Sequence, residues 1–352
     1  MSALAPAPLA GPTAWGEVLG HARVAAEPAD FLVDEQLGFG ASQDGPHLLV
    51  QIQKTELSTA EASQQLAAAW GVAARGIGHA GRKDRQAVTR QWLSVPWPDG
   101  KALPPAGAIN PQLQVLGRAR HRRKLRVGAH TGNRFRLVLR DVNAPRAALN
   151  ARLQAIAMGG VPNYFGPQRF GRNGSNLERA WAWLVEARIR PRGRTDRGML
   201  LSTARSECFN RVLAERVAAN DWNRPGTDDV MMLDGRGSIF LAATESPARL
   251  RQRAAGLSIH PTGPLPGRPG SKAPVPHALA AREAGASAEL AALTAALDEQ
   301  GVEAGRRALR MTVGALGWHW RAADVLVLEF TLPSGGFATT VVRELLGDSA
   351  AQ

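Results

Sequence analysis

The chain has 352 residues, which corresponds to about two ordinary domains. Apolar residues make up 44% of it and charged residues 21%, a globular composition that argues against wholesale disorder. The single cysteine, Cys208, excludes an internal disulfide and a zinc site built on thiolates alone, and it indicates a reducing compartment. The start of the chain lacks the charged region of a secretion signal, and no run of about 18 apolar residues follows. We therefore expect a soluble, cytoplasmic protein.

The charge balance is the first indication of a partner. Lysine and arginine number 43 against 30 aspartates and glutamates, which gives a formal net charge of +13. Such an excess favours a polyanion, because each lysine or arginine that neutralises a phosphate releases a condensed counterion. A basic enzyme from a GC-rich genome would show the same excess, so charge alone leaves both interpretations open.

The first elements expected in chain order are an irregular leader and a capped helix. Residues 1–20 are rich in alanine, proline and glycine and predict a loose leader. A helix is expected over Leu57–Gly71, because Ser58 precedes Glu61 by three residues, the spacing of a capping box, and the final glycine can end the helix. The stretch Asp84–Val95 predicts a turn that continues as a strand.

Two strands are predicted by alternation of apolar and polar residues. In Arg134–Arg140, Phe135, Leu137 and Leu139 fall on one face and arginines on the other. Val325–Leu332 predicts a second strand, and Pro333–Gly336 predicts the turn after it.

The middle of the chain has a different character. Alanine-rich segments there predict helices over Glu178–Ala187, Ser202–Ala219 and Ala278–Gln300. The stretch His260–Pro276 is so rich in proline and glycine that we expect a surface loop rather than a regular element. Strand-rich sequence before and after this middle predicts an α+β architecture. Its outer domain is discontinuous, over residues 1–159 and 309–352, and an inserted, helix-rich domain covers residues 160–308.

The densest local signal for chemistry lies around Asp84. This aspartate stands among Arg82, Lys83 and Arg85, whose charges favour the ionised carboxylate. An ionised carboxylate held in place can act as a nucleophile or as a general base. The alternative is a surface turn in which the aspartate is only salt-bridged.

Two groups of basic residues predict contacts to a nucleic-acid backbone, although each could be a solvated surface. The stronger group comprises Arg118, Arg120, Arg122, Arg123, Lys124 and Arg126. The second group comprises Arg188, Arg190, Arg192, Arg194 and Arg197.

Other motifs give weaker or negative signals. Pro162–Gly171 interleaves aromatic rings with amides and an arginine, so it could stack bases, or it could be a hinge that packs two domains together. The eight histidines show no paired metal-ligand spacing, and no phosphate-binding loop of the GxxxxGK[ST] type occurs. We expect neither a metal nor a cofactor.

The segment GHAGRKDRQAVTRQWLSV around Asp84 resembles the signature of the TruD family of tRNA pseudouridine synthases, G-x-K-D-x-x-A-x-T-x-Q. Further blocks agree with the family in order along the chain: Pro28–Glu35, Gly132–Phe135, Pro162–Gly171 and Leu332–Glu344. The resemblance implies isomerisation of uridine to pseudouridine, typically at position 13 of certain tRNAs, without cofactor or metal. It also implies a pseudouridine-synthase catalytic domain with a mixed β-sheet, interrupted by an inserted TRUD domain.

By this resemblance Asp84 is the nucleophile and the partner is tRNA. We expect the protein to act as a monomer and to bind no membrane. Residues expected to bind the substrate are Phe31, Lys83, Asn133, Phe135 and Phe337, of which Phe135 stands where other pseudouridine synthases carry a tyrosine. Many relatives have a lysine shortly before the Pro28–Glu35 block, and here only Arg23 could take its place. Two alternatives stay open: an RNA N-glycosidase that uses the same aspartate, and an RNA-binding or chaperone protein.

Overall fold

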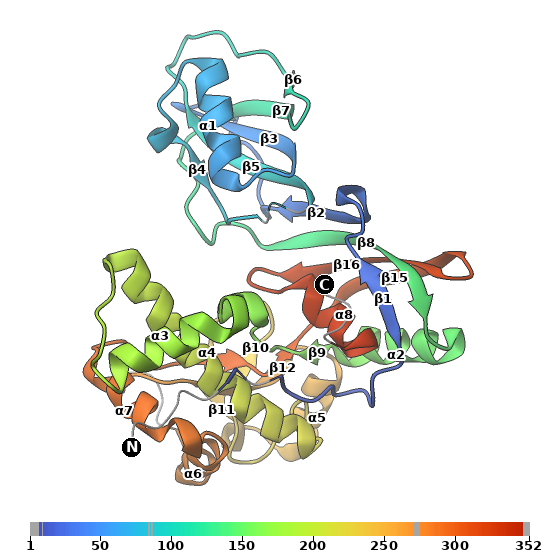
Figure 1. The fold of residues 1–352 in the computed structure, drawn as a ribbon, viewed down its shortest axis with the longest axis vertical. Helices are drawn as coiled ribbons and strands as arrows, with labels where there is room; N and C mark the ends of the chain where they lie inside the picture. The colour runs from blue at the N-terminus through green and yellow to red at the C-terminus, as the bar shows by residue number, and fades with distance from the viewer. Residues whose placement is uncertain (1–6, 9, 84, 86, 271–274, 348–352) are drawn as a thin grey trace. The chain divides into compact units, whose positions relative to one another are not determined.

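The computed structural model describes residues 7–8, 10–83, 85, 87–270 and 275–347 (Figure 1). The chain divides into two compact units. Unit 1 comprises residues 1–18, 154–312 and 339–344, and unit 2 comprises residues 19–153, 313–338 and 345–352. Helices α2 (Arg146–Gly159) and α8 (Ala338–Leu346) contribute residues to both units.

Unit 2 is built on a ten-stranded sheet with the order β15-β16-β8-β2-β5-β3-β7-β6, in which β1 also pairs with β8 and β4 with β5. The sheet is mixed, because β2 and β5 run parallel whereas the other pairs are antiparallel. The expected α+β class is confirmed. The strands are β1 (His21–Val24), β2 (Phe31–Gln36), β3 (His47–Thr55), β4 (Gly78–His79), β5 (Val88–Pro96), β6 (Gly107–Asn110), β7 (Leu113–His121), β8 (Gly132–Asn143), β15 (Gly314–Ala322) and β16 (Val325–Pro333).

The helix predicted near residue 57 is α1 (Thr59–Trp70), and its caps are those expected from the sequence. Ser58 accepts a hydrogen bond from the Glu61 amide, the Glu61 carboxylate accepts one from the Ser58 amide, and Gly71 ends the helix at φ +64°. Figure 1 shows α1 lying over β3 and β5. Its buried face packs with these strands in one apolar cluster, which also includes Ile77 after the helix.

The prediction of alternating faces in β8 is also confirmed. Phe135 and its apolar neighbours on the strand are buried, whereas the arginines of the other face form ion pairs. Arg134 pairs with Glu329 at 2.9 Å and Arg140 with Asp30 at 2.7 Å. β16 starts at the expected Val325, ends one residue later than expected, at Pro333, and lies beside β8 in antiparallel register.

Unit 1 combines helices with a small sheet of the order β11-β10-β12-β13 and a two-stranded pair, β14-β9. Its helices are α3 (Ser175–Leu184), α4 (Arg194–Ala218), α5 (Pro247–Ala255), α6 (His277–Ala286) and α7 (Ala291–Glu299). Its strands are β9 (Val161–Pro162), β10 (Val230–Leu233), β11 (Ile239–Leu241), β12 (Ile259–Leu265), β13 (Gly305–Ala308) and β14 (Arg310–Met311). The 3₁₀ turns of the two units are Pro28–Asp30, Ala74–Gly76, Pro167–Arg169, Arg172–Gly174, Ala242–Thr244 and Ala288–Leu290.

The expectation of a surface loop over His260–Pro276 was wrong for its first part. Residues up to Leu265 form the buried strand β12, which lies between β10 and β13. Proline removes a backbone donor, but Thr262 supplies a hydroxyl that donates to the Val230 carbonyl at 2.6 Å. The Pro261 carbonyl still accepts from the Leu309 amide at 2.8 Å. A strand can therefore persist here despite two prolines.

Other expected boundaries also changed. The long helix expected over Ala278–Gln300 is two helices, α6 and α7, separated near Ser287, and α4 starts eight residues before the expected Ser202. The expected loose leader is wrong for the part around Trp15. This indole lies edge-on to Trp222 at 5.9 Å and donates to the Gly160 carbonyl at 2.9 Å, within unit 1.

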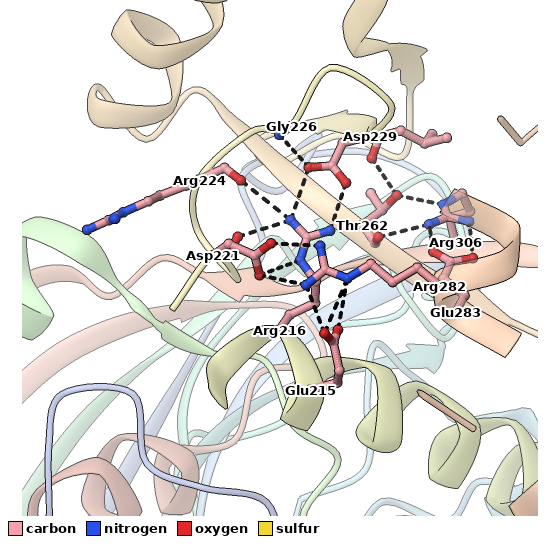
Figure 2. A network of polar contacts seen from close by, with 11 residues as sticks. Glu215, Arg216, Asp221, Arg224, Gly226, Asp229, Thr262, Arg282, Glu283 and Arg306 are labelled. Atoms are coloured by element: carbon pink, nitrogen blue, oxygen red, sulfur yellow. Dashed lines mark hydrogen bonds and ion pairs between the residues drawn. The ribbon is translucent and has the colours of Figure 1, made fainter. Parts of the chain in front are cut away.

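A network of arginines and carboxylates stabilises unit 1 (Figure 2). Arg216 is buried in α4 and donates to both oxygens of Asp229, at 2.7 and 3.0 Å. Arg282 bridges Glu215 and Asp221, and Arg306 of β13 pairs with Glu283 (Figure 2). Each of these three guanidinium groups has at least one carboxylate partner, which the buried charges of Arg216 and Arg306 require.

Candidate active site

Inward-facing side chains of β2 and β8 form the floor of the candidate site in unit 2. In the antiparallel register of these strands, Glu35 lies opposite Asn133 and Val33 lies opposite Phe135. Residues two apart on a strand share a face, so one row of side chains carries both polar and aromatic groups.

Lys83 and Glu35 form a buried ion pair over this floor. The Lys83 ammonium lies 2.8 Å from the Glu35 carboxylate and donates to the Asn133 side-chain carbonyl, also at 2.8 Å. The other Glu35 oxygen accepts the backbone N–H of Trp92 at 2.9 Å. The exposed side-chain fractions are 7% for Lys83 and 0% for Glu35, so each charge depends on the other for its compensation.

The backbone that leads to Asp84 is held by buried polar side chains. The Thr59 hydroxyl at the start of α1 accepts the Lys83 backbone N–H at 2.9 Å and lies 3.0 Å from the side-chain oxygen of Gln91. The Gln91 amide in turn donates to the Gly81 carbonyl at 2.6 Å. These contacts fix the loop up to Lys83; Asp84, the predicted nucleophile, lies outside the described residues.

An aromatic group adjoins the polar cluster. Phe31 lies edge-on to Phe135 with ring centroids 6.3 Å apart, and Phe135 stacks on Phe330 at 5.5 Å. Phe135 is 6% exposed, whereas Phe31 is half-buried. Phe337 is half-buried between β16 and α8, and among the described residues no ring contact joins it to the other two.

Two histidines line the same loop. Burial is the main cause that lowers the pKa of His79 and of His130 below the ordinary 6.5, so both rings are uncharged at pH 7. His130 also lies 3.1 Å from the Ser334 hydroxyl, in the turn that follows β16. The neutral imidazoles therefore add no charge beside the Lys83–Glu35 pair.

The strongest basic stretch divides into two kinds of residue. Arg118 and Arg120 are bound within unit 2: Arg118 donates to the Pro104 carbonyl, and Arg120 donates to carbonyls of the 97–101 loop at 2.7–3.0 Å. Arg122 pairs with Asp44 at 2.8 Å, and Lys124 reaches the Arg75 carbonyl at 3.3 Å. Arg123 and Arg126 are exposed, and within the described parts of the chain neither side chain has a hydrogen-bond or ion-pair partner.

The arginines of the second group, from Arg188 to Arg197, are all exposed in unit 1, around the start of α4. Arg188 pairs with Glu186, and Arg197 donates to the Gln300 carbonyl at 2.9 Å. Arg23 lies on β1 and forms an exposed ion pair with Asp141 at 2.5 Å.

A sequence model of the family tRNA pseudouridine synthase D (TruD) matches residues 20–189 and 194–345. The chain belongs to the TruD family.

Curated relatives agree over nearly the whole length. A tRNA pseudouridine synthase D from Azotobacter vinelandii is 47% identical over 339 residues, which cover 96% of this chain and 95% of the relative. One from Pseudomonas aeruginosa is 45% identical over 349 residues, which cover 98% and 96%. A crystal structure from Methanosarcina mazei that carries the TruD name superposes with a TM-score of 0.70 over 96% of each chain at 22% identity, which shows the shared fold. Pseudouridine synthases are isomerases, and the family assignment places this chain in that enzyme class.

Sequence reasoning named Lys83, Asn133, Phe31 and Phe135, and the structure brings them together on one side of the unit 2 sheet. It missed Glu35 as a site residue. The available signal was its inward position on an alternating strand, where Val33 and Glu35 share a face and a carboxylate must have a buried cation as partner. Over the residues described, no helix is long and apolar enough to span a membrane, and no group of three or more potential metal ligands occurs.

Replacing Phe135 by leucine tests whether this ring acts on the substrate. Leucine keeps an apolar side chain in the core, so we expect a folded protein whose kcat/KM falls about 5- to 150-fold, equivalent to about 1–3 kcal/mol of stacking energy. Phe330→Leu is the control, because Phe330 is buried on the other side of the same stack. Equal activity of the two variants per folded molecule, measured beside their unfolding midpoints, would assign Phe135 to the core alone.

Proposed function

We propose that this protein isomerises uridine to pseudouridine in tRNA, at position 13, with Asp84 as the nucleophile. The observation that carries the proposal is the buried Lys83–Glu35–Asn133 cluster, which holds the backbone directly before Asp84 within the segment that matches the TruD signature. Unit 2 would be the catalytic domain, and residues 160–308, most of unit 1, would be the TRUD domain.

The reaction requires three changes in the nucleotide. The bond between N1 of uracil and C1′ of ribose breaks, the base turns, and a bond forms between C5 and C1′. The proton displaced from C5 leaves, and N1 gains one, so the mass of the RNA does not change. A single carboxylate can support this course by attacking C1′ of the ribose or C6 of the uracil, and the target must first leave the base stack.

The proposed site supplies surroundings suited to a flipped base. Phe31 offers a partly exposed ring beside the buried Phe135, and aromatic faces stack on bases of any sequence. Lys83 is neutralised by Glu35, so its ammonium would position the loop and donate hydrogen bonds rather than add net charge.

Mapping of pseudouridine in the tRNA of cells with and without this protein tests the proposal. We expect one uridine, at position 13, to lose its modification in the deletion strain, and the purified protein to restore it. Release of free uracil from the RNA would instead indicate an N-glycosidase. Tight RNA binding without either change would indicate a binding protein or chaperone.

Neutralising exposed residues of the basic stretch should weaken RNA binding. The Arg123→Gln/Arg126→Gln variant removes two charges that have no partner in the described chain, and we expect its salt slope, log Kd against log[KCl], to flatten by about 0.7–0.9 for each phosphate that is no longer neutralised. Arg120→Gln is the comparison, because this side chain holds a loop and its removal should lower the unfolding midpoint. An unchanged slope for the double variant would identify a solvated surface.

A further inference from the structure

Three arginines of unit 1 stand apart from the network of Figure 2, because none has a carboxylate partner. Arg169, Arg205 and Arg307 form no ion pair with any described residue, whereas Arg306, the neighbour of Arg307 on β13, pairs with Glu283. Successive residues of a strand point to opposite faces, so Arg306 lies beside a carboxylate whereas Arg307 points to the other face, where none is described.

The three side chains lie along one face of α4. Arg169 donates to the Ser202 hydroxyl at 3.0 Å, Arg205 belongs to the helix itself, and Arg307 lies 5.7 Å from the ring centre of Phe209. Positions 202, 205 and 209 are three and four residues apart, the spacing of neighbours on a helix surface. We call Arg169, Arg205 and Arg307 the α4 arginine group.

Phe165 forms the platform between two members of this group. The Arg307 guanidinium lies 4.2 Å from the centre of the ring, and that of Arg169 lies 5.4 Å from it. Asn210 holds the platform, since its side-chain amide accepts the Phe165 N–H at 2.9 Å and donates to the Phe165 carbonyl at 3.0 Å. The position of the ring is therefore set before any ligand arrives.

The charges of this group are not compensated within the described protein. Burial, followed by the charge of Arg169, lowers the pKa of Arg307 to about 10, and burial lowers those of Arg169 and Arg205. By contrast, the carboxylates around Arg282 raise its pKa. All three remain protonated at pH 7, and two like charges share one aromatic ring.

The group retains capacity to donate. Arg205 binds the Leu265 and Glu303 carbonyls at 3.1 and 2.9 Å through one terminal nitrogen, but its buried Nε–H has no partner among the described residues. The Arg169 guanidinium has a single described hydrogen bond, to Ser202. Each of the three residues is partly exposed.

From this geometry we infer that the α4 arginine group binds phosphodiester groups of the RNA backbone. Guanidinium groups match phosphate oxygens through paired N–H donors, and a phosphate would supply the negative charge that unit 1 lacks at this place. The inference rests on the proposed function, because it takes the RNA to be the tRNA substrate. It assigns this part of unit 1 a role in holding the RNA backbone, separate from the chemistry in unit 2.

The test compares binding of a tRNA transcript as KCl is varied. We expect Arg169→Gln/Arg307→Gln to weaken binding about tenfold or more for each charge-assisted hydrogen bond to phosphate that is removed, and to flatten the salt slope by about 0.7–0.9 per phosphate. The value of kcat at saturating tRNA should change little, while KM rises. Arg253→Gln is the matched control, because Arg253 also lies over a phenylalanine, Phe240 at 5.2 Å, but pairs with Glu245.

A second variant separates charge from packing. Arg307→Lys keeps the positive charge but cannot keep both hydrogen bonds that Arg307 donates to Asn163. If the residue binds phosphate, lysine should restore the salt slope, whereas a structural role would leave the lysine variant as impaired as the glutamine variant.

Unchanged affinity and slope in the double variant, with the wild type forming pseudouridine normally, would overturn the inference and leave the proposed function intact. Failure of the wild type to form pseudouridine would instead remove the proposed function. Weaker binding accompanied by unfolding in Arg169→Gln alone, which leaves the hydrogen bonds to Asn163 in place, would show that the group is structural.

Discussion

Asp84→Asn should abolish pseudouridine formation while leaving the protein folded and able to bind tRNA. Asparagine keeps the shape and one hydrogen-bonding oxygen but removes the carboxylate, so the change tests charge rather than packing. The flanking Lys83 is already paired with Glu35 and does not depend on Asp84 for compensation. Single-turnover assays with purified tRNA would measure the loss of activity, which we expect to be complete within detection.

Two control measurements test whether the loss of activity is caused by the chemistry alone. The unfolding midpoint should change by little, since asparagine keeps the shape of aspartate and the sequence around position 84 is polar. The Kd for tRNA should stay the same or decrease, because a negative charge near phosphates is gone. Appreciable isomerisation by the asparagine variant would rule out Asp84 as nucleophile and with it the proposed mechanism.

Glu35→Gln should produce the largest loss of stability in unit 2. Breaking a buried ion pair leaves the other charge uncompensated and costs about 3–5 kcal/mol. Lys83 would lose the carboxylate that compensates its charge and keep only neutral oxygens as partners, so the loop before Asp84 would lose its charged anchor. Chemical denaturation would measure the change in the free energy of unfolding, and single-turnover rates would measure the expected loss of activity.

The double variant Glu35→Gln/Lys83→Met separates stability from function. Removing both charges should recover much of the stability, because apolar replacements of buried pairs are often tolerated. Activity should not return, since the positioning hydrogen bonds are absent. Glu329→Gln is the control: its pairs with Arg134 and Arg136 are partly exposed and should contribute only about 0–1 kcal/mol. Full activity in the double variant would show that the pair serves folding alone.

Local sequence signals predicted those elements whose determinants lie within a few residues. The capping box at Ser58 and the alternation in β8 predicted α1 and a strand with the correct faces, because caps and strand faces depend on near neighbours. The strand β12 was missed for the opposite reason. Its prolines oppose a strand locally, and the Thr262 hydroxyl that satisfies Val230 lies 32 residues away in sequence.

The candidate site was predicted only in part, and mostly through the resemblance to a family. The grouping of Lys83 with Asn133 and Phe135 followed from ordered motifs. No local pattern indicated that Lys83 pairs with Glu35, 48 residues earlier, because a contact between a loop and a distant strand depends on the tertiary fold. Likewise, the basic composition around Arg120 predicted an RNA contact, but its side chain donates hydrogen bonds to backbone carbonyls within unit 2.

The short pair of β9 and β14 has a consequence for how such a chain can arise. Val161 and Pro162 lie beside Met311 and Arg310, and the Asn163 amide donates to the Leu309 carbonyl at 2.8 Å. The nearly 150 residues between these two strands thus begin and end at neighbouring points in the structure. A segment of this kind can be inserted into an existing turn at little entropic cost, because the entropic cost of closing a loop grows only slowly with its length. The pairing of β9 with β14 fixes both ends of the segment at one place, although Trp15, from outside the segment, also packs on Trp222 within it.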